Sequence, residues 1–323
     1  MKALEVSRIG DPLEVVQLIE HPEPPAVSGV QVLLQMLYAP INPYDMNIAR
    51  GHIPVPSFPA TLGTEGVARV LEVGNQVENV KVGDVVFIPS GPGSWRERLV
   101  VSSNGLFPLP GGADLQQLAM GAANPSTAAL MLRNFVDLNP GDWIVQNAGN
   151  SAVAASVNAF ARARGFRTIS LVRRPEAIEA ALALGADVVL EDDESAANKI
   201  AEATGNAKIR LGLDGVGGSS LMSLTKLVEF GGTVVVYSAM SGQPGICNPM
   251  DVIFRDIRIR GIFLGHDHVR NSTALVEGLR EGLNLITTGK LHVPVGGVFA
   301  LENFREAFSA CEKGKKILLT AAF

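Results

Sequence analysis

The spacing of apolar residues changes at about residue 125 of this 323-residue chain. Before that point, short apolar or alternating runs are separated by Gly and Pro turns at close intervals, a pattern typical of β-strands. From there to about residue 262, apolar runs alternate with segments of helical periodicity, which predicts a parallel sheet with helices on both faces. The tail has the texture of the first part, and we expect it to return to that part.

The pattern predicts individual elements in each part. In the first part, strands are expected at 30–36, 67–73, 85–88 and 97–101. In the middle part, helices are expected at 177–184, 196–204 and 221–230, and strands at 188–190, 211–214, 233–237 and 258–264. In the tail, helices are expected at 274–287 and 303–313, and strands at 298–300 and 317–321. The predicted fold class is therefore α/β, with a β-rich part beside a doubly wound parallel sheet.

The segment 143–174 carries the most specific pattern. It reads as a strand at 143–146, a turn at 147–150, a helix, and a second strand at 168–172. This order places a helix N-terminus at the carboxyl end of a parallel strand, where free backbone N–H groups can hold a pyrophosphate. Asn150 and Ser151 can cap the helix and bond phosphate oxygens. Alanines stand where the nucleotide fingerprint usually has glycines, so a buried strand–helix–strand unit without a nucleotide is the alternative.

Two arginines follow the second strand of this segment. An acidic residue normally stands there, because it binds the ribose hydroxyls of NAD. Arg173 and Arg174 lie 24 and 25 residues after Gly149 instead. A guanidinium group suits a 2′-phosphate, so the sequence favours NADPH over NADH.

The composition and charge of the chain exclude several classes of protein. With 47% hydrophobic and 18% charged residues the chain is globular, and a net charge of −5 argues against a nucleic-acid or membrane-surface binder. The two cysteines, Cys247 and Cys311, are too few for a disulfide framework or a cysteine-rich zinc lobe. The sequence shows neither an apolar signal core nor a run of 18 apolar residues. We therefore expect a cytoplasmic protein with no nucleic-acid and no membrane partner.

Six short motifs in a fixed order add a family resemblance. They are INPYD (41–45), LGTEGV (62–67), SWR (94–96), NPSTA (124–128), QNAGNS (146–151) and FRDIRIRG (254–261). Their order resembles the medium-chain dehydrogenase/reductase superfamily, most closely the 2-enoyl thioester (trans-2-enoyl-CoA) reductases and next the quinone oxidoreductases. The resemblance implies a GroES-like catalytic domain at 1–122, a Rossmann domain that binds NADPH at 123–265, and a return to the catalytic domain at 266–323.

The superfamily has zinc-dependent and zinc-free branches, and the resemblance indicates the second. A zinc site needs Cys, His and carboxylate ligands that converge on one point. Asn42 and Thr64 stand where the zinc enzymes carry a Cys and a His, and Asp45 and Glu65 alone make a poor zinc site. We expect no metal.

The resemblance also assigns residues to the cofactor. The expected NADPH contacts are Asn124, Asn150, Ser151, Ala152, Val153, Arg173, Arg174, Tyr237, Ser238, Ala239, Met240, Ile262, Phe263, Leu264 and Lys315. For several of them the residues themselves allow a simpler interpretation. Ser151 can be a helix cap only, Tyr237 a core aromatic, and Lys315 a solvated charge.

One family residue is absent. Ile53 stands where the enoyl reductases carry a tyrosine that orients or protonates the substrate. Tyr44 is the nearest phenol along the chain, and we expect it, with Asn42, to meet the substrate carbonyl. His52 is a second candidate donor, although a single loop histidine is more often simply exposed.

The sequence thus predicts an NADPH-dependent, zinc-independent reductase of small molecules with a conjugated carbonyl group: an enoyl thioester, an enone or an enal. Two alternatives stay open, a quinone oxidoreductase and a catalytically idle NADPH-binding protein on the same fold. The stretch 256–264 reads as a sheet-edge strand that passes into a cleft. Pairing of this edge with a second copy predicts a homodimer, while Arg258 and Arg260 would blunt the edge in a monomer.

Overall fold

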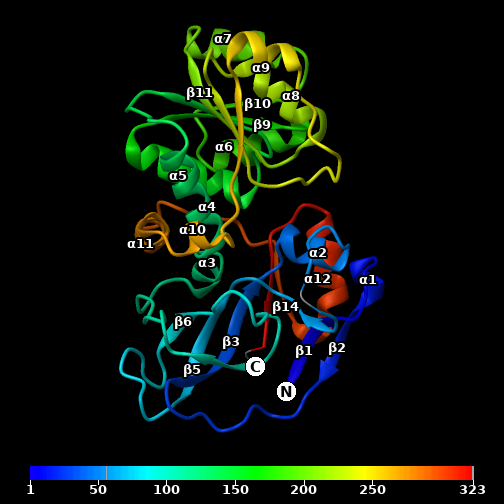
Figure 1. Ribbon diagram of the computed structural model, residues 1–323, viewed down its shortest axis with the longest axis vertical. Coiled ribbons are helices and arrows are strands. Elements are labelled where there is room, and N and C mark those ends of the chain that lie inside the picture. The colour runs from blue at the N-terminus through cyan, green and yellow to red at the C-terminus, as the bar shows by residue number, and fades with distance from the viewer. Residues whose placement is uncertain (56, 322–323) are drawn as a thin grey trace. The chain divides into compact units, whose positions relative to one another are not determined.

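The computed structural model describes residues 1–55 and 57–321, and the chain forms two compact units (Figure 1). Unit 1 comprises Met1–Ala122 and Pro294–Phe323, and unit 2 comprises Ala123–Val293. Within the described residues, no helix is long and apolar enough to span a membrane. The predicted α/β fold class is confirmed: a β-rich unit accompanies a parallel sheet with helices.

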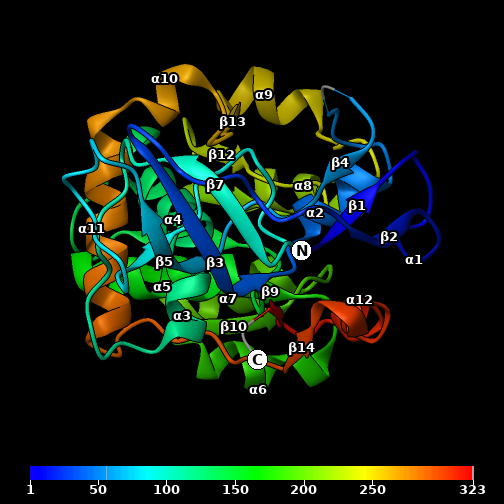
Figure 2. The same cartoon turned by 90° about the horizontal axis from the view of Figure 1, so that it is seen from below.

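Unit 1 is built mainly from antiparallel strands. A small sheet has the order β2-β1-β4, and a larger one has the order β14-β15-β3-β5-β6, with β7 also paired to β3. The long strand β3 lies between β5 and β7 (Figure 2). The strands are β1 (Lys2–Val6), β2 (Val16–Glu20), β3 (Gln31–Pro40), β4 (Ala60–Thr61), β5 (Val67–Val73), β6 (Val85–Phe87), β7 (Arg98–Ser102), β14 (Gly297–Ala300) and β15 (Ile317–Thr320). The helices are α1 (Pro12–Val15), α2 (Pro43–Ala49), α3 (Leu115–Ala119), the 3-10 turn η2 (Leu301–Asn303) and α12 (Phe304–Glu312).

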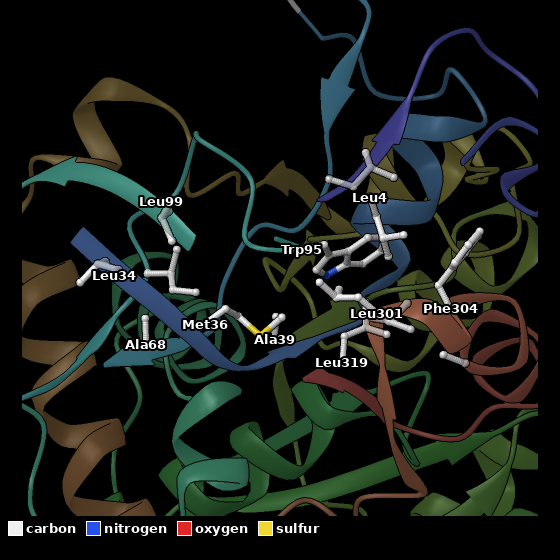
Figure 3. Packing of buried hydrophobic residues seen from close by; sticks show 14 of the residues in the cluster. Leu4, Leu34, Met36, Ala39, Ala68, Trp95, Leu99, Leu301, Phe304 and Leu319 are labelled. Carbon is white, nitrogen blue, oxygen red and sulfur yellow. The ribbon is translucent and has the colours of Figure 1, made fainter. Parts of the chain in front are cut away.

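Trp95 lies in the core of unit 1. It is fully buried, its ring centroid is 5.5 Å from that of Phe308, and its indole N–H donates to the Pro40 carbonyl at 3.2 Å. Leu4 and Leu319 belong to the same cluster (Figure 3). Because Phe308 and Leu319 come from the end of the chain and Leu4 from its beginning, the core closes only when the tail returns.

Unit 2 contains a six-stranded sheet of order β10-β9-β8-β11-β12-β13, and all of its pairs are parallel. The strands are β8 (Trp143–Gln146), β9 (Arg167–Val172), β10 (Val188–Glu191), β11 (Ile209–Asp214), β12 (Thr233–Val236) and β13 (Arg258–Gly261). Buried Val, Ile and Leu side chains of the inner strands form its core, as expected for a parallel sheet covered on both faces. The predicted edge position of β13 is confirmed.

The helices of unit 2 alternate with these strands. They are α4 (Ala123–Asn134), α5 (Ala152–Arg164), the 3-10 turn η1 (Pro175–Ala177), α6 (Ile178–Ala183), α7 (Ala196–Thr204), α8 (Gly218–Leu227), α9 (Pro249–Arg255), α10 (Asp267–Arg270) and α11 (Thr273–Thr287). Helix α11 lies in unit 2 and not with the returning tail, although the sequence pattern placed 266–323 in one segment. The cause is close packing on α4: a Cβ at Gly278 or Gly282 would come within 2.7 Å of Ala129 or Pro125.

Most predicted elements agree with the observed ones to within a few residues, and two differences have a clear cause. The strand expected at 258–264 ends at Gly261, because the chain turns there and only Ile262 N–H still reaches the Val236 carbonyl, at 3.1 Å. The helix expected at 221–230 is shifted to Gly218–Leu227. Its start follows Gly217, whose φ of +72° suits the sharp turn out of β11.

Candidate functional site

The turn between β8 and α5 is shaped to hold an anion. Ser151 caps α5, since its side chain accepts from Ala154 N–H at 3.1 Å. The Gly149 N–H donates to the Leu171 carbonyl at 2.9 Å, and a Cβ at Gly149 would lie 2.7 Å from Ser170 Cβ. A glycine is thus needed for the turn to touch the end of β9. The first N–H groups of α5, which lack partners within the helix, end at this strand edge and can bind phosphate oxygens.

A buried carboxylate ties a second turn to the first. Asp214, fully buried at the end of β11, accepts from Asn147 Nδ2 at 2.6 Å and from the N–H groups of Val216 and Gly217, each at 2.9 Å. Asn147 Oδ1 in turn accepts from Gly215 N–H at 2.7 Å. The Asn147 amide and the Asp214 carboxylate therefore fix the turns after β8 and β11 against each other.

Tyr237 covers the turn after β11. Its backbone N–H donates to the Asp214 carbonyl at 2.9 Å, and a Cβ at Gly215 would come within 2.4 Å of its hydroxyl oxygen. Burial raises the pKa of Tyr237; the neighbouring Ser151 side chain lowers it and the Asp214 carboxylate raises it. The phenol is therefore neutral, and it sits between the cap of α5 and the end of β11, on the edge where a cofactor would lie.

Arg173 and Arg174 follow β9 directly. Both are exposed, and neither forms a salt bridge with any residue in 1–55 or 57–321. Strand β9 is the parallel neighbour of β8, so these guanidinium groups belong to the same strand edge as the α5 N-terminus. They are positioned for an anion at the end of β9.

The strand topology brings most of the predicted cofactor residues to one edge. At the carboxyl ends of parallel strands lie Asn150, Ser151, Ala152 and Val153 after β8, Arg173 and Arg174 after β9, Tyr237, Ser238, Ala239 and Met240 after β12, and Ile262, Phe263 and Leu264 after β13. Asn124 lies in the first turn of α4, and Lys315 lies in unit 1 between α12 and β15.

In unit 1, Asn42 is the centre of a buried polar cluster. Asn42 begins α2, and its Nδ2 donates to Glu65 Oε1 at 2.9 Å while its Oδ1 accepts from Lys316 Nζ at 2.5 Å. Asp45, three residues on, caps the Asn42 N–H through its Oδ2 at 2.9 Å. Asp45 accepts from the backbone at the start of α2, while the Asn42 side-chain amide bonds Glu65 and Lys316. These two bonds fix the orientation of the amide.

Burial shifts the ionisation of this cluster. It raises the pKa of Asp45 to about 7, against the opposing effects of the Asn42 N–H and Thr64; the Glu65 charge raises that pKa as well. Burial also lowers the pKa of Lys316, and the Glu65 carboxylate is the main group that opposes this. At neutral pH the Asp45 carboxyl group is therefore about half protonated.

Tyr44 and Ile53 both pack on the core of unit 1 and are half-buried. Burial raises the pKa of Tyr44, and the adjacent Asp45 raises it further. The Tyr44 phenol is therefore a neutral donor at physiological pH. Ile53 can offer only apolar surface, and His52 beside it is exposed.

Comparisons with known proteins agree with this geometry. Residues 28–111 match the family "Alcohol dehydrogenase GroES-like domain" and residues 152–278 the family "Zinc-binding dehydrogenase". The mitochondrial enoyl-[acyl-carrier-protein] reductase of Homo sapiens is 36% identical over 97% of this chain and 86% of its own length. The enzyme of the same name from Caenorhabditis elegans is 39% identical over 79% of this chain and 74% of its own. The chain belongs to the enoyl reductase family of the medium-chain dehydrogenase/reductase superfamily.

Solved structures show the same architecture in this enoyl reductase family and beyond it. The mitochondrial 2-enoyl thioester reductase heterodimer of Candida tropicalis has a TM-score of 0.88 at 25% identity and covers 99% of both chains. A quinone oxidoreductase of Pseudomonas syringae has a TM-score of 0.85 at 26% identity, again over 99% of both chains. Both chemistries therefore occur on this fold.

The second family is named for zinc, but the residues here do not fit that metal. The group at Asn42 offers an amide, the Thr64 hydroxyl and two carboxyl groups, without the nitrogen or sulfur donors that zinc prefers. The Lys316 ammonium already occupies the Asn42 oxygen, and a second cation there would be repelled. Within residues 1–55 and 57–321, no three His, Cys, Asp or Glu side chains are grouped so that they could hold a metal ion.

Some residues that shape the site were not predicted from the sequence. Asp214 and Asn147 are 67 residues apart, and Lys316 and Asn42 are 274 residues apart, so each pair exists only in the folded chain. For Asp214 a signal was present: an acidic residue directly after an apolar strand and before a glycine-rich turn, at 214–218. For Lys316, one of two adjacent lysines, the sequence held no such signal.

The buried carboxyl group gives a pH-dependent prediction. The pKa of Asp45 is about 7 in the folded chain against 3.8 as its ordinary value, so folding takes up a proton between these pH values and the wild type loses stability as pH rises through them. Asp45→Asn keeps the acceptor for Asn42 N–H and cannot ionise. From pH 4 to pH 8, its free energy of unfolding relative to wild type should rise by a few kcal/mol, at about 1.4 kcal/mol per pH unit.

Denaturant titrations at each pH measure this difference. The surface variant Asp11→Asn controls for the loss of a carboxylate. A difference between Asp45→Asn and wild type that stays constant across the range would contradict the account.

Proposed function

We propose that the protein is a zinc-independent, NADPH-dependent reductase of α,β-unsaturated carbonyl compounds, with enoyl thioesters as the first candidate class. Similarity to the human enoyl-[acyl-carrier-protein] reductase over 97% of this chain supports this proposal. So do Arg173 and Arg174 at the end of β9, which form no salt bridge with any residue that the structure describes. The superfamily uses a nicotinamide cofactor, and the arginines favour the form with a 2′-phosphate. The names of the relatives place them in mitochondria; a cytoplasmic location stays our prediction from the sequence.

The residues of unit 2 would bind and orient the cofactor. The α5 N-terminus would hold the pyrophosphate, and Arg173 and Arg174 would bind the 2′-phosphate. The Tyr237–Met240 turn and residues 262–264 would contact the rest of the cofactor. Asn124 and Lys315 are assigned to the cofactor by family resemblance. When bound, the nicotinamide supplies a hydride to the β-carbon of the substrate. The protein contributes the relative orientation of the two reactants.

The residues of unit 1 would stabilise the charge that develops on the substrate carbonyl oxygen. The neutral Tyr44 hydroxyl can donate a hydrogen bond to that oxygen. An amide NH₂ has two hydrogens; Glu65 takes one from Asn42, and the other can serve as a second donor. The α-carbon then receives a proton from Tyr44 or from water, because Ile53 has none to give.

A quinone oxidoreductase is the second candidate. The half-buried, apolar Ile53 favours it, since a quinone needs an apolar surface and no dedicated proton donor. The similarity to the Pseudomonas syringae quinone oxidoreductase fits this alternative as well. The third candidate is a protein that binds NADPH but catalyses no reaction.

One panel of assays distinguishes these functions. NADPH oxidation is followed with crotonyl-CoA, an alkyl enone and a quinone, each before and after exhaustive chelation. We expect the highest kcat/KM with the thioester and no loss on chelation. Activity with the quinone alone would favour the second candidate, and binding of NADPH without turnover of any substrate would favour the third.

Arg173 gives a prediction for cofactor choice. Arg173→Ala should weaken NADPH binding about tenfold to a hundredfold, because a hydrogen bond to a charged group is worth about 1.5–3 kcal/mol. NADH binding should hardly change. Calorimetric titration measures both dissociation constants. The control is Arg280→Ala, which removes another exposed arginine of unit 2; equal effects of the two variants, or equal wild-type affinity for NADPH and NADH, would refute the assignment.

Tyr44 gives a prediction for turnover. Tyr44→Phe keeps the ring on the unit 1 core and removes the donor, so kcat on the best substrate should fall about 10²-fold while NADPH affinity stays the same. Tyr38→Phe, which alters another half-buried tyrosine of unit 1, serves as the control. Wild-type turnover by Tyr44→Phe would assign the role to water or to another group.

We also propose a homodimer that forms through β13. This strand is a sheet edge, and an unpaired edge must be blunted or paired. Of its arginines, Arg258 pairs with Asp256 at 2.8 Å, and Arg260 lies over the Phe135 ring. The helix before it, α9, exposes 67% of both Ile253 and Phe254. An apolar surface beside an open edge suits pairing with a second copy around a two-fold axis.

The dimer is tested by light scattering at micromolar concentration. We expect twice the 34.1 kDa mass of one chain for wild type. Phe254→Glu should shift the mass toward one chain, since it places a charge in the apolar contact. Val82→Glu, at an exposed position of unit 1, should leave the dimer intact. A wild-type mass near 34.1 kDa would show that no such pairing occurs.

A further inference from the structure

Unit 1 has a surface hollow that the strand edge and the Asn42 cluster leave unexplained. Its volume is about 410 Å³, and its lining residues belong to α12 and to the turn after that helix. Its lining includes three cations, Arg305, Lys313 and Lys315, with Glu306 as the one carboxylate and Ser309 as a hydroxyl. The hollow therefore has an excess of positive charge and can donate several hydrogen bonds.

The cations of the hollow are not neutralised by ion pairs. Arg305 is held in place, because it donates to the Leu13 carbonyl and lies 4.9 Å over the Phe304 ring. Lys313 and Lys315 are exposed, and in the part of the chain that the structure describes neither forms a salt bridge. Arg305 and Lys313 are not among the residues assigned to the cofactor, and one fixed guanidinium with one exposed ammonium group is a donor set that suits a phosphate.

The hollow lies beside the helix that carries Tyr44. Glu312, at the end of α12, accepts from Arg50 at 3.0 Å, and Arg50 is the C-cap of α2. Lys316, one residue after Lys315, donates to Asn42 at the start of α2. The segment with the two exposed lysines is thus fastened at both ends to the residues that flank α2. The hollow and Tyr44 are thus linked through the two ends of α2, within unit 1.

We propose that this hollow binds the phosphate group of the carrier to which an enoyl thioester substrate is attached. The inference rests on the proposed function, since it concerns how that substrate is held. Coenzyme A and an acyl carrier protein both present the acyl group on a pantetheine arm that ends in a phosphate. The hollow recognises this shared group, so it contributes to the binding of the carrier and not to the reduction itself.

The test compares thioesters that differ only in the carrier. Crotonyl-CoA, crotonyl-phosphopantetheine and crotonyl-pantetheine share the reacting group, but the last lacks phosphate. An exposed charge contact is worth about twofold to fivefold in affinity, so Lys313→Glu, which reverses a charge, should raise KM for the two phosphorylated thioesters about tenfold. Its KM for crotonyl-pantetheine and its kcat should stay within about twofold of wild type. Salt should weaken the wild-type preference for phosphate.

Lys81→Glu is the matched control, because Lys81 is another exposed lysine of unit 1 outside the hollow. If Lys313→Glu raises KM for crotonyl-phosphopantetheine, the hollow binds the phosphate that both carriers share. If Lys313→Glu raises KM for crotonyl-CoA alone, the hollow binds the phosphates of the adenosine part. Equal losses for all three thioesters, or equal effects of Lys313→Glu and Lys81→Glu, would overturn the proposal.

A binding measurement keeps this test separate from the proposed function. Calorimetry with free CoA and free pantetheine requires no turnover. We expect CoA to bind wild type more tightly than pantetheine and to lose about tenfold in affinity in Lys313→Glu. If no thioester is reduced but this difference is present, the proposed function fails and the phosphate site stands. If wild type binds both ligands equally, the phosphate site fails whatever the activity.

Discussion

The buried Asp214 carboxylate is the constraint on which the cofactor edge depends. A buried carboxylate needs hydrogen-bond donors, and Asp214 Oδ1 accepts from Asn147 Nδ2 and from the N–H groups of the glycine-rich turn after β11. These bonds draw the turns after two neighbouring strands together. With them in place, the α5 N-terminus, the arginines after β9 and the Tyr237 turn lie along one edge, which is the usual position for a ligand of a parallel sheet and the place where we propose that the cofactor binds.

Unit 1 also contains buried carboxyl groups, and a different set of residues forms hydrogen bonds around them. Asn42 lies between Lys316 Nζ and Glu65 Oε1, and burial raises the pKa of Asp45 to about 7. In the zinc-dependent branch a metal ion would supply the positive charge at such a place; here Lys316, directly before the last strand, donates to Asn42 instead. This explains how a fold that also serves zinc enzymes can close around polar groups without a metal. It also ties the returning tail to the helix that carries Tyr44.

Local patterns in the sequence were enough to predict all six strands of the parallel sheet, but they missed β1, β2 and β4 of unit 1 and helices α4 and α9 of unit 2. The runs 67–73 and 196–204 match their elements residue for residue, because β-branched alternation and helical periodicity are local signals. Helix α2 was not predicted, because a helix of seven residues within a β-rich part is too short to show a helical periodicity. The Asn147–Asp214 and Asn42–Lys316 contacts could not be predicted, because they join residues that only the fold brings together. The place of α11 depends in the same way on its packing against α4.

The central claim is that hydride passes from the cofactor to a conjugated carbon without a metal. It is tested most directly with NADPH that carries deuterium at C4 of the nicotinamide, an enoyl thioester, and protein treated with a chelator. NMR of the product should show a saturated thioester with deuterium at the β-carbon and a solvent hydrogen at the α-carbon. Deuterium on the carbonyl carbon, or a reaction that stops until zinc is restored, would contradict the account.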